Sequence, residues 1–275
     1  MTTQLLGATF DLYIKRRKRP GRYWSELENR FQKHLIPDLG GRTRVLSTIT
    51  KAELRDLIET KEDQGYPVAA RTTYEVLNPF FKWCLGKDLI LSNPLSTLPP
   101  PGIPKSRDKI LSESEIKAIW KATFDMPLWG PFYRLLMLTC QRRNEVAGIQ
   151  YGEIYNNEWT IPGSRTKNGR SHLVHLSTSA MTIIESKPEF IGRQVSGFSK
   201  AKRTIDRLSG VKNWRIHDLR RTGATTMQRL GVLPDHIELI LNHSSKGVKG
   251  IYQRFQYLEE RKDALELLGL YLECL

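Results

Sequence analysis

The chain has 275 residues, of which 43 are Lys or Arg and 29 are Asp or Glu, so its formal net charge is +14 at pH 7. A content of 39% hydrophobic residues is enough for one large core or two of ordinary size, which excludes wholesale disorder. No apolar run approaches the roughly 20 residues of a membrane span, and the first residues lack a signal-peptide pattern.

The excess of positive charge favours a polyanionic partner, because neutralising phosphates releases the counterions condensed on a nucleic acid. Charge alone does not separate nucleic acids from other acidic surfaces. The three cysteines are widely spaced and form no CxxC pair; they are Cys84, Cys140 and Cys274. They indicate neither a disulfide framework nor a cysteine-rich zinc site, and are typical of thiols in a reducing cytosol.

The first part of the chain is predicted to be helical. An apolar stripe over residues 27–35 predicts a helix that Pro37 stops. Thr50 and Glu53 have the spacing of a capping box and predict a second helix, which ends near Gly65.

A further apolar stripe over residues 76–84 predicts a helix that ends near Gly86 and that Pro79 kinks. A basic run lies in the first helix or just past it, and consists of Lys15, Arg16, Arg17, Lys18 and Arg19. Such a run fits a solvated face, but in a chain of this charge we favour contact with phosphates.

Four prolines within residues 99–104 cannot continue a helix and favour an extended connector. We therefore divide the chain into domains 1–104 and 105–275. In the second domain Ser112 and Glu115 form another capping box, and a strongly apolar helix follows over residues 132–138. Helical patterns return later, near Met181, Ile205, Met227, Ile237 and Leu265.

Two short strands are predicted between these helices, over residues 158–161 and 172–176. Asn168-Gly169 lies between them and predicts a two-residue type I′ turn that closes a β-hairpin. The fold class that follows is mainly α, with a small antiparallel β-sheet in the second domain.

Motifs for nucleotide and metal chemistry are missing from the sequence: it has no GxxxxGK[ST], no GxGxxG after a strand, no HExxH and no GxSxG. No acidic cluster resembles a magnesium nuclease site. Chemistry at a phosphate would then depend on guanidinium groups, which stay protonated and bind two phosphate oxygens at once.

Four segments contain suitable groups. Arg142 and Glu145 are three residues apart, so on a helical turn the carboxylate can hold the guanidinium. Lys167 precedes the predicted tight turn and projects on the hairpin. His217 and Arg220 are also three apart and share one helix face.

The fourth segment contains His243, with Tyr252 nine residues later. Taken singly, the four segments fit ordinary roles, such as a structural salt bridge, a solvent-exposed lysine or a packed tyrosine. The zinc interpretation of the histidines is poor, because no carboxylate or thiol stands at ligand spacing. Only the order and combination of the segments are informative.

The ordered set resembles the catalytic signature of the tyrosine recombinases, the phage integrase family. Three strings contain the match: TCQRRNE at 139–145, HDLRRTGAT at 217–225, and LNHSS at 241–245 with Tyr252 following. The resemblance covers residues 105–275, and the region before the prolines looks more loosely like the helical core-binding domain of the family. Cys140 and Asn242 stand where the family usually has glycine, which alters a turn but removes no reactive group.

The resemblance implies a catalytic tyrosine recombinase domain that cuts and rejoins DNA without a metal or a cofactor. Tyr252 would attack a phosphodiester and leave a 3′-phosphotyrosyl link and a free 5′-hydroxyl. Arg142 and Arg220 would neutralise the transition state, Lys167 would protonate the departing 5′-oxygen, and His217 would assist proton movement at the nucleophile.

The same resemblance implies that His243 hydrogen-bonds the phosphate and that Glu145 orients Arg142 or a histidine. The basic run, with Lys105 and Arg107 in the linker, would contact the DNA backbone. The two domains would form a C-shaped clamp around the duplex.

The partners implied are double-stranded DNA recombination sites and further copies of the chain, as a homotetramer that passes through a Holliday junction in the cytosol of a prokaryotic cell or of a phage host. An apolar stripe over residues 263–272 fits either exchange into a neighbouring protomer or packing on its own domain. The DNA target, the direction of the reaction and the fate of an N-terminal arm-binding domain, lost or never present, stay open.

Three alternatives remain. A type IB topoisomerase uses similar groups to relax supercoils, but the compact two-domain layout and the three strings argue against it. A catalytically silent DNA-binding module of the same fold would not need all six reactive positions, yet all six are filled. A metal-dependent nuclease fits least, for want of an acidic cluster.

Overall fold

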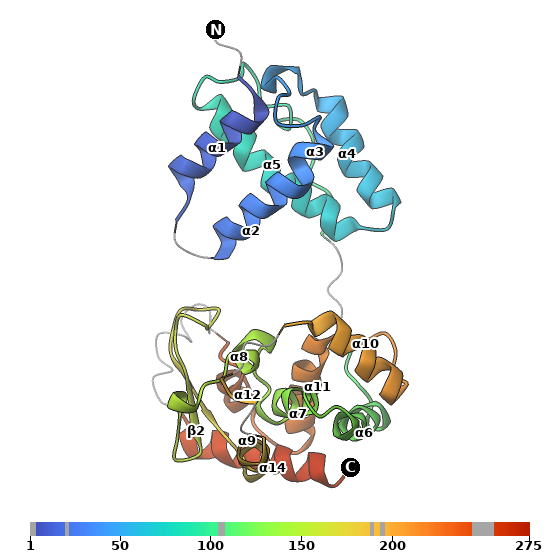
Figure 1. The fold of residues 1–275 in the computed structure, drawn as a ribbon, viewed down its shortest axis with the longest axis vertical. Helices are drawn as coiled ribbons and strands as arrows, with labels where there is room; N and C mark the ends of the chain where they lie inside the picture. The colour runs from blue at the N-terminus through green and yellow to red at the C-terminus, as the bar shows by residue number, and fades with distance from the viewer. Residues whose placement is uncertain (1–3, 20–21, 104–107, 188–189, 193–195, 244–255) are drawn as a thin grey trace. The chain divides into compact units, whose positions relative to one another are not determined.

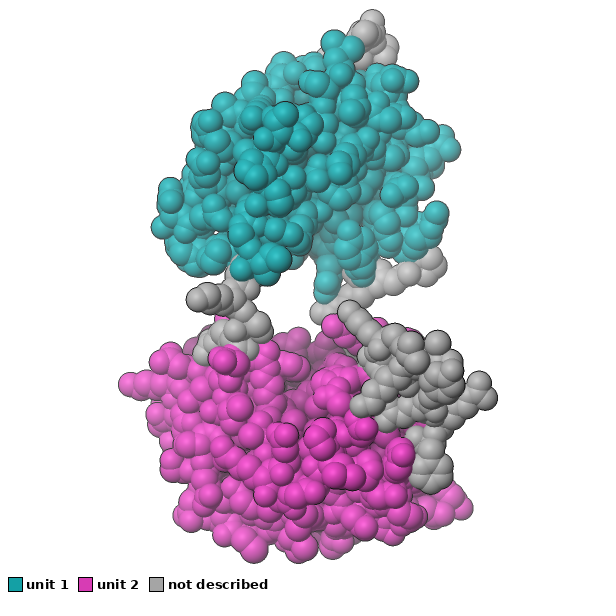
Figure 2. Space-filling model, turned by 180° about the vertical axis from the view of Figure 1, so that it is seen from behind, with its two compact units in different colours: residues 1–106 teal, residues 107–275 magenta. Residues whose placement is uncertain are grey.

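The computed structural model describes residues 4–19, 22–103, 108–187, 190–192, 196–243 and 256–275 (Figure 1). The chain divides into two compact units, residues 1–106 and 107–275 (Figure 2). Each unit has its own hydrophobic core. The sequence-based boundary after residue 104 lies two residues before this division. Within the described ranges, no helix combines the length and the apolar composition that crossing a membrane requires.

Unit 1 is helical and contains α1 (Leu6–Arg17), α2 (Arg22–Arg30), a π-helical turn (Phe31–Leu35), α3 (Ile36–Asp38), a 3₁₀ turn (Leu46–Thr48), α4 (Lys51–Asp63) and α5 (Pro67–Leu85). Its core is aromatic: the Phe10 and Phe31 rings stack at 4.0 Å, and Phe80 meets Phe31 edge-on at 5.2 Å. The helix that was predicted to stop at Pro37 ends one residue later, at Asp38.

The capping box predicted for α4 is present. The Glu53 amide donates to Thr50 Oγ1 at 3.2 Å, and the Thr50 amide donates to Glu53 Oε2 at 2.8 Å. These two bonds satisfy N–H groups that have no partner within the helix, so residues of the sequence fix where α4 begins. Pro79 lies inside α5, as predicted.

Unit 2 is mainly helical with one small sheet, which confirms the predicted fold class. Its elements before the sheet are α6 (Glu113–Ala122), a 3₁₀ turn (Thr123–Asp125), α7 (Gly130–Thr139), α8 (Arg143–Ala147) and a 3₁₀ turn (Tyr151–Glu153). The sheet contains β1 (Ile154–Tyr155), β2 (Glu158–Ile161) and β3 (His172–His175). It is followed by α9 (Thr178–Ser186), α10 (Phe198–Ser209), α11 (Ile216–Arg229), α12 (Pro234–Ile240) and α14 (Leu258–Glu273).

The sheet is antiparallel in the order β1-β2-β3. Trp159 of β2 pairs with Val174 of β3, and both side chains are buried. Asn156 and Asn157 join β1 to β2 with φ angles of 49° and 59°. Positive φ at both central residues is what a two-residue type I′ turn requires, and asparagine tolerates it.

The prediction of a type I′ turn at Asn168-Gly169 is wrong. Such a turn needs a positive φ at both residues, and only Gly169 has one, at 73°. The ladder stops at Ile161 opposite His172, since Pro162 follows with no N–H to donate. Residues 162–171 therefore form a loop, which we call the Lys167 loop.

The loop closes on itself at its base. The Thr166 hydroxyl lies 3.0 Å from the Gly163 carbonyl oxygen and 2.8 Å from that of Arg170. A Cβ at Gly163 would collide with the Gly169 carbonyl, so the two sides of the loop approach as closely as glycine permits. The loop is therefore folded back rather than extended.

The last helix, α14, packs on its own unit. Its apolar stripe is buried in the core of unit 2, through Ala264, Leu265, Leu268 and Leu272. The Glu266 carboxylate accepts hydrogen bonds from His175 Nε2 at 2.9 Å and from the Thr178 amide at 3.1 Å, which joins α14 to β3 and to the start of α9. Packing on its own domain is thus the arrangement that the described chain adopts.

Candidate active site

Helix α11 presents His217 and Arg220 from its first turns. The Asp218 carboxylate, buried behind them, accepts a hydrogen bond from the Arg215 amide at 2.8 Å and so fixes the start of the helix. His217 and Arg220 are one turn apart on this fixed helix end. The His217 side chain is exposed, while that of Arg220 is only 4% exposed.

The buried guanidinium of Arg220 bridges the ends of two helices. Its Nη1 donates to the carbonyl of Cys140, the C-cap residue of α7, at 2.7 Å, and its Nη2 donates to the carbonyl of Leu241, the C-cap residue of α12. The C-terminal ends of helices carry partial negative charge, which offsets part of the cost of burying a cation. Burial and the charge of Arg142 lower the pKa of Arg220 to about 10, so the group stays protonated at neutral pH.

Arg142 is the N-cap residue of α8 and is held by Glu145, as predicted from their spacing. Its Nη1 lies 3.0 Å from Glu145 Oε1, and its backbone amide donates to Glu145 Oε2 at 2.8 Å. The Glu145 carboxylate is almost fully buried, so both of its oxygens serve this one residue. The Nη2 of Arg142 donates to the Asn242 carbonyl at 3.4 Å, just beyond the end of α12.

The end of α12 is where the site converges. The helix ends with a Schellman motif. The His243 amide donates to the backbone carbonyl of Glu238, and the Asn242 amide donates to that of Leu239, each at 3.0 Å. Asn242 adopts the left-handed conformation that this motif needs, with φ of 49°. The carbonyls of residues 240–242 then accept hydrogen bonds from four side chains of three chain segments, namely Gln141, Arg142, His172 and Arg220.

His172 is a member of this group that the sequence did not reveal. Its Nε2 lies 3.1 Å from the Ile240 carbonyl, and because a carbonyl only accepts, Nε2 carries the proton. Burial, followed by the charge of Arg261, lowers the pKa of His172 to about 4, so the ring is neutral at pH 7. No local pattern distinguishes this histidine from any other inward-facing strand residue.

The Lys167 loop is attached to the same helix end. Asn168 Nδ2 donates to Asn242 Oδ1 at 2.7 Å, which brings the residue after Lys167 against the turn that follows α12. The Lys167 side chain is exposed and has no ion pair with any residue of the described ranges. The loop that contains this ammonium group is thus attached, through Asn168, to the helix end whose carbonyls accept from both guanidinium groups.

The two predicted histidines have different surroundings. His217 has a lowered pKa, chiefly because of partial burial and then because of the charges of Arg220 and Arg221. His243 is exposed, and its Nδ1 lies 2.7 Å from Glu238 Oε2 of α12. A neutral imidazole at 217 is suited to accepting a proton.

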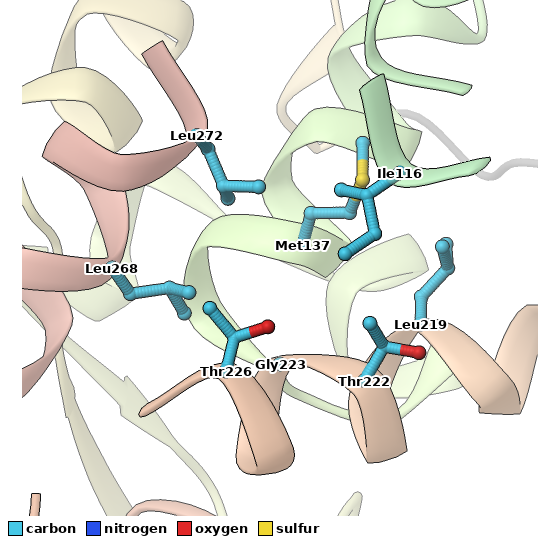
Figure 3. A pocket seen from close by; sticks show the side chains of 8 residues that line it. All are labelled: Ile116, Met137, Leu219, Thr222, Gly223, Thr226, Leu268 and Leu272. Atoms are coloured by element: carbon cyan, nitrogen blue, oxygen red, sulfur yellow. The ribbon is translucent and has the colours of Figure 1, made fainter. Parts of the chain in front are cut away.

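Cys140, at the end of α7, packs against Gly223 of α11. Cys140, where glycine is usual in the resemblance, has φ of 52° at the end of α7. A Cβ on Gly223 of α11 would collide with the Cys140 sulfur, so the glycine on one helix makes room for the cysteine on the other. Gly223 also borders a small apolar cavity, together with Met137 of α7 and Leu268 of α14 (Figure 3).

Three predicted site residues, Tyr252, Lys105 and Arg107, lie outside the described residues. The basic run occupies the last turn of α1 and the residues just after it, as predicted, and all five side chains are exposed. Lys18 forms an ion pair with Glu28 at 2.8 Å. The structure therefore links Arg142, Glu145 and Arg220 to the end of α12, and the Lys167 loop is attached there through Asn168. His217 lies one turn before Arg220 on α11, and His243 follows the turn at Asn242. The basic run belongs to unit 1.

Comparison with known proteins gives a consistent result. The family described as "Phage integrase family" matches residues 107–259. Prophage integrase IntZ of Escherichia coli (strain K12) is 26% identical over 270 residues, which cover 89% of this chain and 64% of that protein. Prophage integrase IntA of the same organism is 34% identical over 145 residues, which cover 47% of this chain and 35% of that protein.

Among solved structures, a lambda integrase tetramer bound to a Holliday junction shares the fold. Its TM-score is 0.74 at 16% identity, over 90% of this chain and 79% of that chain. The chain spans less than two thirds of the length of the two prophage integrases.

Proposed function

Because the chain belongs to the phage integrase family, we propose that it is a tyrosine site-specific recombinase that integrates or excises phage or mobile-element DNA. One observation supports this most directly. Arg142 and Arg220 are far apart in the sequence, yet both donate to carbonyls at the end of α12, where the Lys167 loop is also attached. Such a cluster of positive groups is suited to a phosphate whose charge increases during the reaction.

The cleavage step follows from these groups. The Tyr252 oxygen forms a bond to phosphorus as the bond from phosphorus to the 5′-oxygen breaks. The tyrosine proton passes to the neutral ring of His217, and Lys167 gives a proton to the departing oxygen. The phosphodiester energy is kept in the 3′-phosphotyrosyl link, so a 5′-hydroxyl rejoins the strand by the reverse steps without ATP.

The two arginines keep donors for the phosphate. A guanidinium has five N–H groups, and the contacts of Arg220 to Cys140 and Leu241 use two of them. Arg142 likewise uses two donors, on Glu145 and Asn242. The remaining N–H groups would bind the non-bridging oxygens, and the carbonyl contacts would hold the guanidinium planes in place before DNA arrives.

The partners that we propose are double-stranded recombination sites, with the basic run, Lys105 and Arg107 on the backbone, and a homotetramer on DNA. The structurally similar lambda integrase is a tetramer on a Holliday junction. An α14 exchanged between protomers would have to bury Leu265, Leu268 and its other buried residues equally well in a neighbouring core, because each large side chain left in water costs about 1.5–3 kcal/mol. Exchange of α14 therefore stays compatible with the tetramer that we propose. We place the reaction in the cytosol.

One experiment tests this proposal. Duplexes that the protein binds are selected from a random pool, nicked near the bound site, and incubated with the protein in EDTA. We expect an SDS-resistant protein–DNA adduct that is absent with Tyr252→Phe. Two-site strand exchange, rather than relaxation of a supercoiled plasmid, then distinguishes a recombinase from a type IB topoisomerase.

Other outcomes would contradict the proposal. Binding without an adduct would favour a catalytically silent DNA-binding module. Cleavage that needs added magnesium would favour a nuclease. An adduct that persists in Tyr252→Phe would exclude Tyr252 as the nucleophile.

A further inference from the structure

One hydrogen bond between two asparagines joins the Lys167 loop to the end of α12. Asn168 Nδ2 donates to Asn242 Oδ1 at 2.7 Å, across 74 residues of sequence. The orientation of the Asn168 amide is set on its other side, because its Oδ1 accepts from the Arg170 amide at 3.1 Å. Asn168 therefore presents its NH₂ group to Asn242, and Asn242 must present its oxygen in return.

Asn242 has a second contact, through its main chain. Its carbonyl accepts from Arg142 Nη2 at 3.4 Å. Asn242 thus contacts the Lys167 loop with its side chain and Arg142 with its backbone carbonyl. The Nδ2 of Asn242 is shielded from solvent and has no hydrogen-bond partner, so within the described residues the only bond of this side-chain amide is the one to Asn168.

The turn itself does not need an asparagine. Residue 242 is in the left-handed conformation with φ of 49°, where glycine is the residue with the least strain. The Schellman bonds of Asn242 and His243 are made by backbone amides and would be kept with glycine. The side chain at 242 is therefore explained by its contact with Asn168 rather than by the turn.

We infer that Asn242 is a positioning residue, which with Asn168 as its partner holds the Lys167 loop in register with Arg142. The inference rests on the proposed function, because it assigns Lys167 a proton to deliver. Without the bond, the loop keeps its internal contacts at Thr166 but loses its attachment to the helix end. Lys167 would then spend less time within reach of the leaving 5′-oxygen.

The first variant to test is Asn242→Gly, which removes the side chain and suits the left-handed turn. We expect it to melt at the same temperature as the wild type or higher, and yet to form the covalent adduct about tenfold more slowly, the effect of one neutral hydrogen bond. Asn168→Ala should slow the reaction to the same extent. The double variant should be no slower than either single one, because both remove the same bond.

A modified substrate separates positioning of Lys167 from a structural effect. In a duplex with sulfur in place of the bridging 5′-oxygen, the leaving group is a thiol with a pKa near 8.5, which departs without protonation. On this substrate Lys167→Ala, Asn242→Gly and Asn168→Ala should all react within about twofold of the wild type. Asn157→Gly is the matched control, since Asn157 has φ of 59° in the β1–β2 turn and should be normal on both substrates.

The outcomes are distinguishable. If Lys167→Ala is rescued by sulfur but the asparagine variants are not, the inference is wrong while the proposed chemistry stands. If Lys167→Ala is not rescued, the assigned role of Lys167 fails and the inference with it. Wild-type rates for Asn242→Gly on the normal substrate would also overturn the inference. If substitutions at residue 242 impair folding, Asn168→Ala tests the same hydrogen bond from an exposed loop.

Discussion

The packing of Gly223 against Cys140 gives a stability prediction that a double-mutant cycle can test. In Gly223→Ala the new Cβ collides with the Cys140 sulfur, while its next neighbours, Cys140 Cβ at 3.8 Å and the Met137 carbonyl at 3.9 Å, are at ordinary contact distance. Overpacking costs about 1–3 kcal/mol, and a Cβ this deep inside contact distance of a buried sulfur belongs in the upper part of that range, at about 2–3 kcal/mol; the better helix propensity of alanine returns about 1 kcal/mol. We expect a net loss of about 1–2 kcal/mol.

The second arm of the cycle removes the sulfur. Cys140→Gly relieves a left-handed conformation that costs a non-glycine residue about 1–2 kcal/mol, and loses a buried side chain of similar value. The single variant should therefore be close to the wild type. In Cys140→Gly/Gly223→Ala the collision is absent, so the pair should lie within about 1 kcal/mol of the wild type, with a coupling energy of about 2 kcal/mol.

Calorimetry of the full chain measures these differences. A loss of 1–2 kcal/mol in a unit of this size lowers Tm by about 2–8 °C. Gly86→Ala is the control, since its Cβ would lie 3.5 Å from the nearest atom and should cost nothing. A Gly223→Ala protein as stable as the wild type, or a double variant as unstable as Gly223→Ala, would refute the reasoning. Because the Cys140 carbonyl holds Arg220, adduct formation should fall and recover in parallel.

Three further predictions concern charge. Glu145→Gln removes the negative charge that pairs with Arg142, so we expect a Tm drop equivalent to about 1–3 kcal/mol and slower adduct formation; unchanged values would show the pair to be dispensable. The pKa of His172 falls from an ordinary 6.5 to about 4, so the unfolded chain takes up the proton first and stability is lost as pH falls from 6.5 towards 4. Urea unfolding should show a loss of about 2 kcal/mol between pH 7 and pH 5 that His172→Gln removes, and an equal slope in both proteins would contradict this. Arg16→Gln should lower the salt dependence of DNA binding by about 0.9 in log–log slope, and an unchanged slope would place Arg16 away from phosphate.

Helix starts and one ion pair could be predicted from the sequence because they depend on local interactions. The capping boxes of Thr50 with Glu53 and of Ser112 with Glu115 formed as predicted, because each is a contact over three residues that needs no tertiary partner. The pairing of Arg142 with Glu145 is of the same kind. The type I′ turn was assigned to the wrong loop, since where a strand ends depends on Pro162 and on how residues 162–171 fold back.

The order of reactive residue types, and with it the family, was determined by the sequence alone. What the tertiary structure decided is where those residues meet. Carbonyls at the end of α12 gather side chains from segments up to 100 residues away, among them a buried histidine with no distinguishing pattern. A backbone carbonyl is present at every residue and leaves no mark in the sequence, so only the packing of α7, α11 and α12 could show that these acceptors hold both arginines.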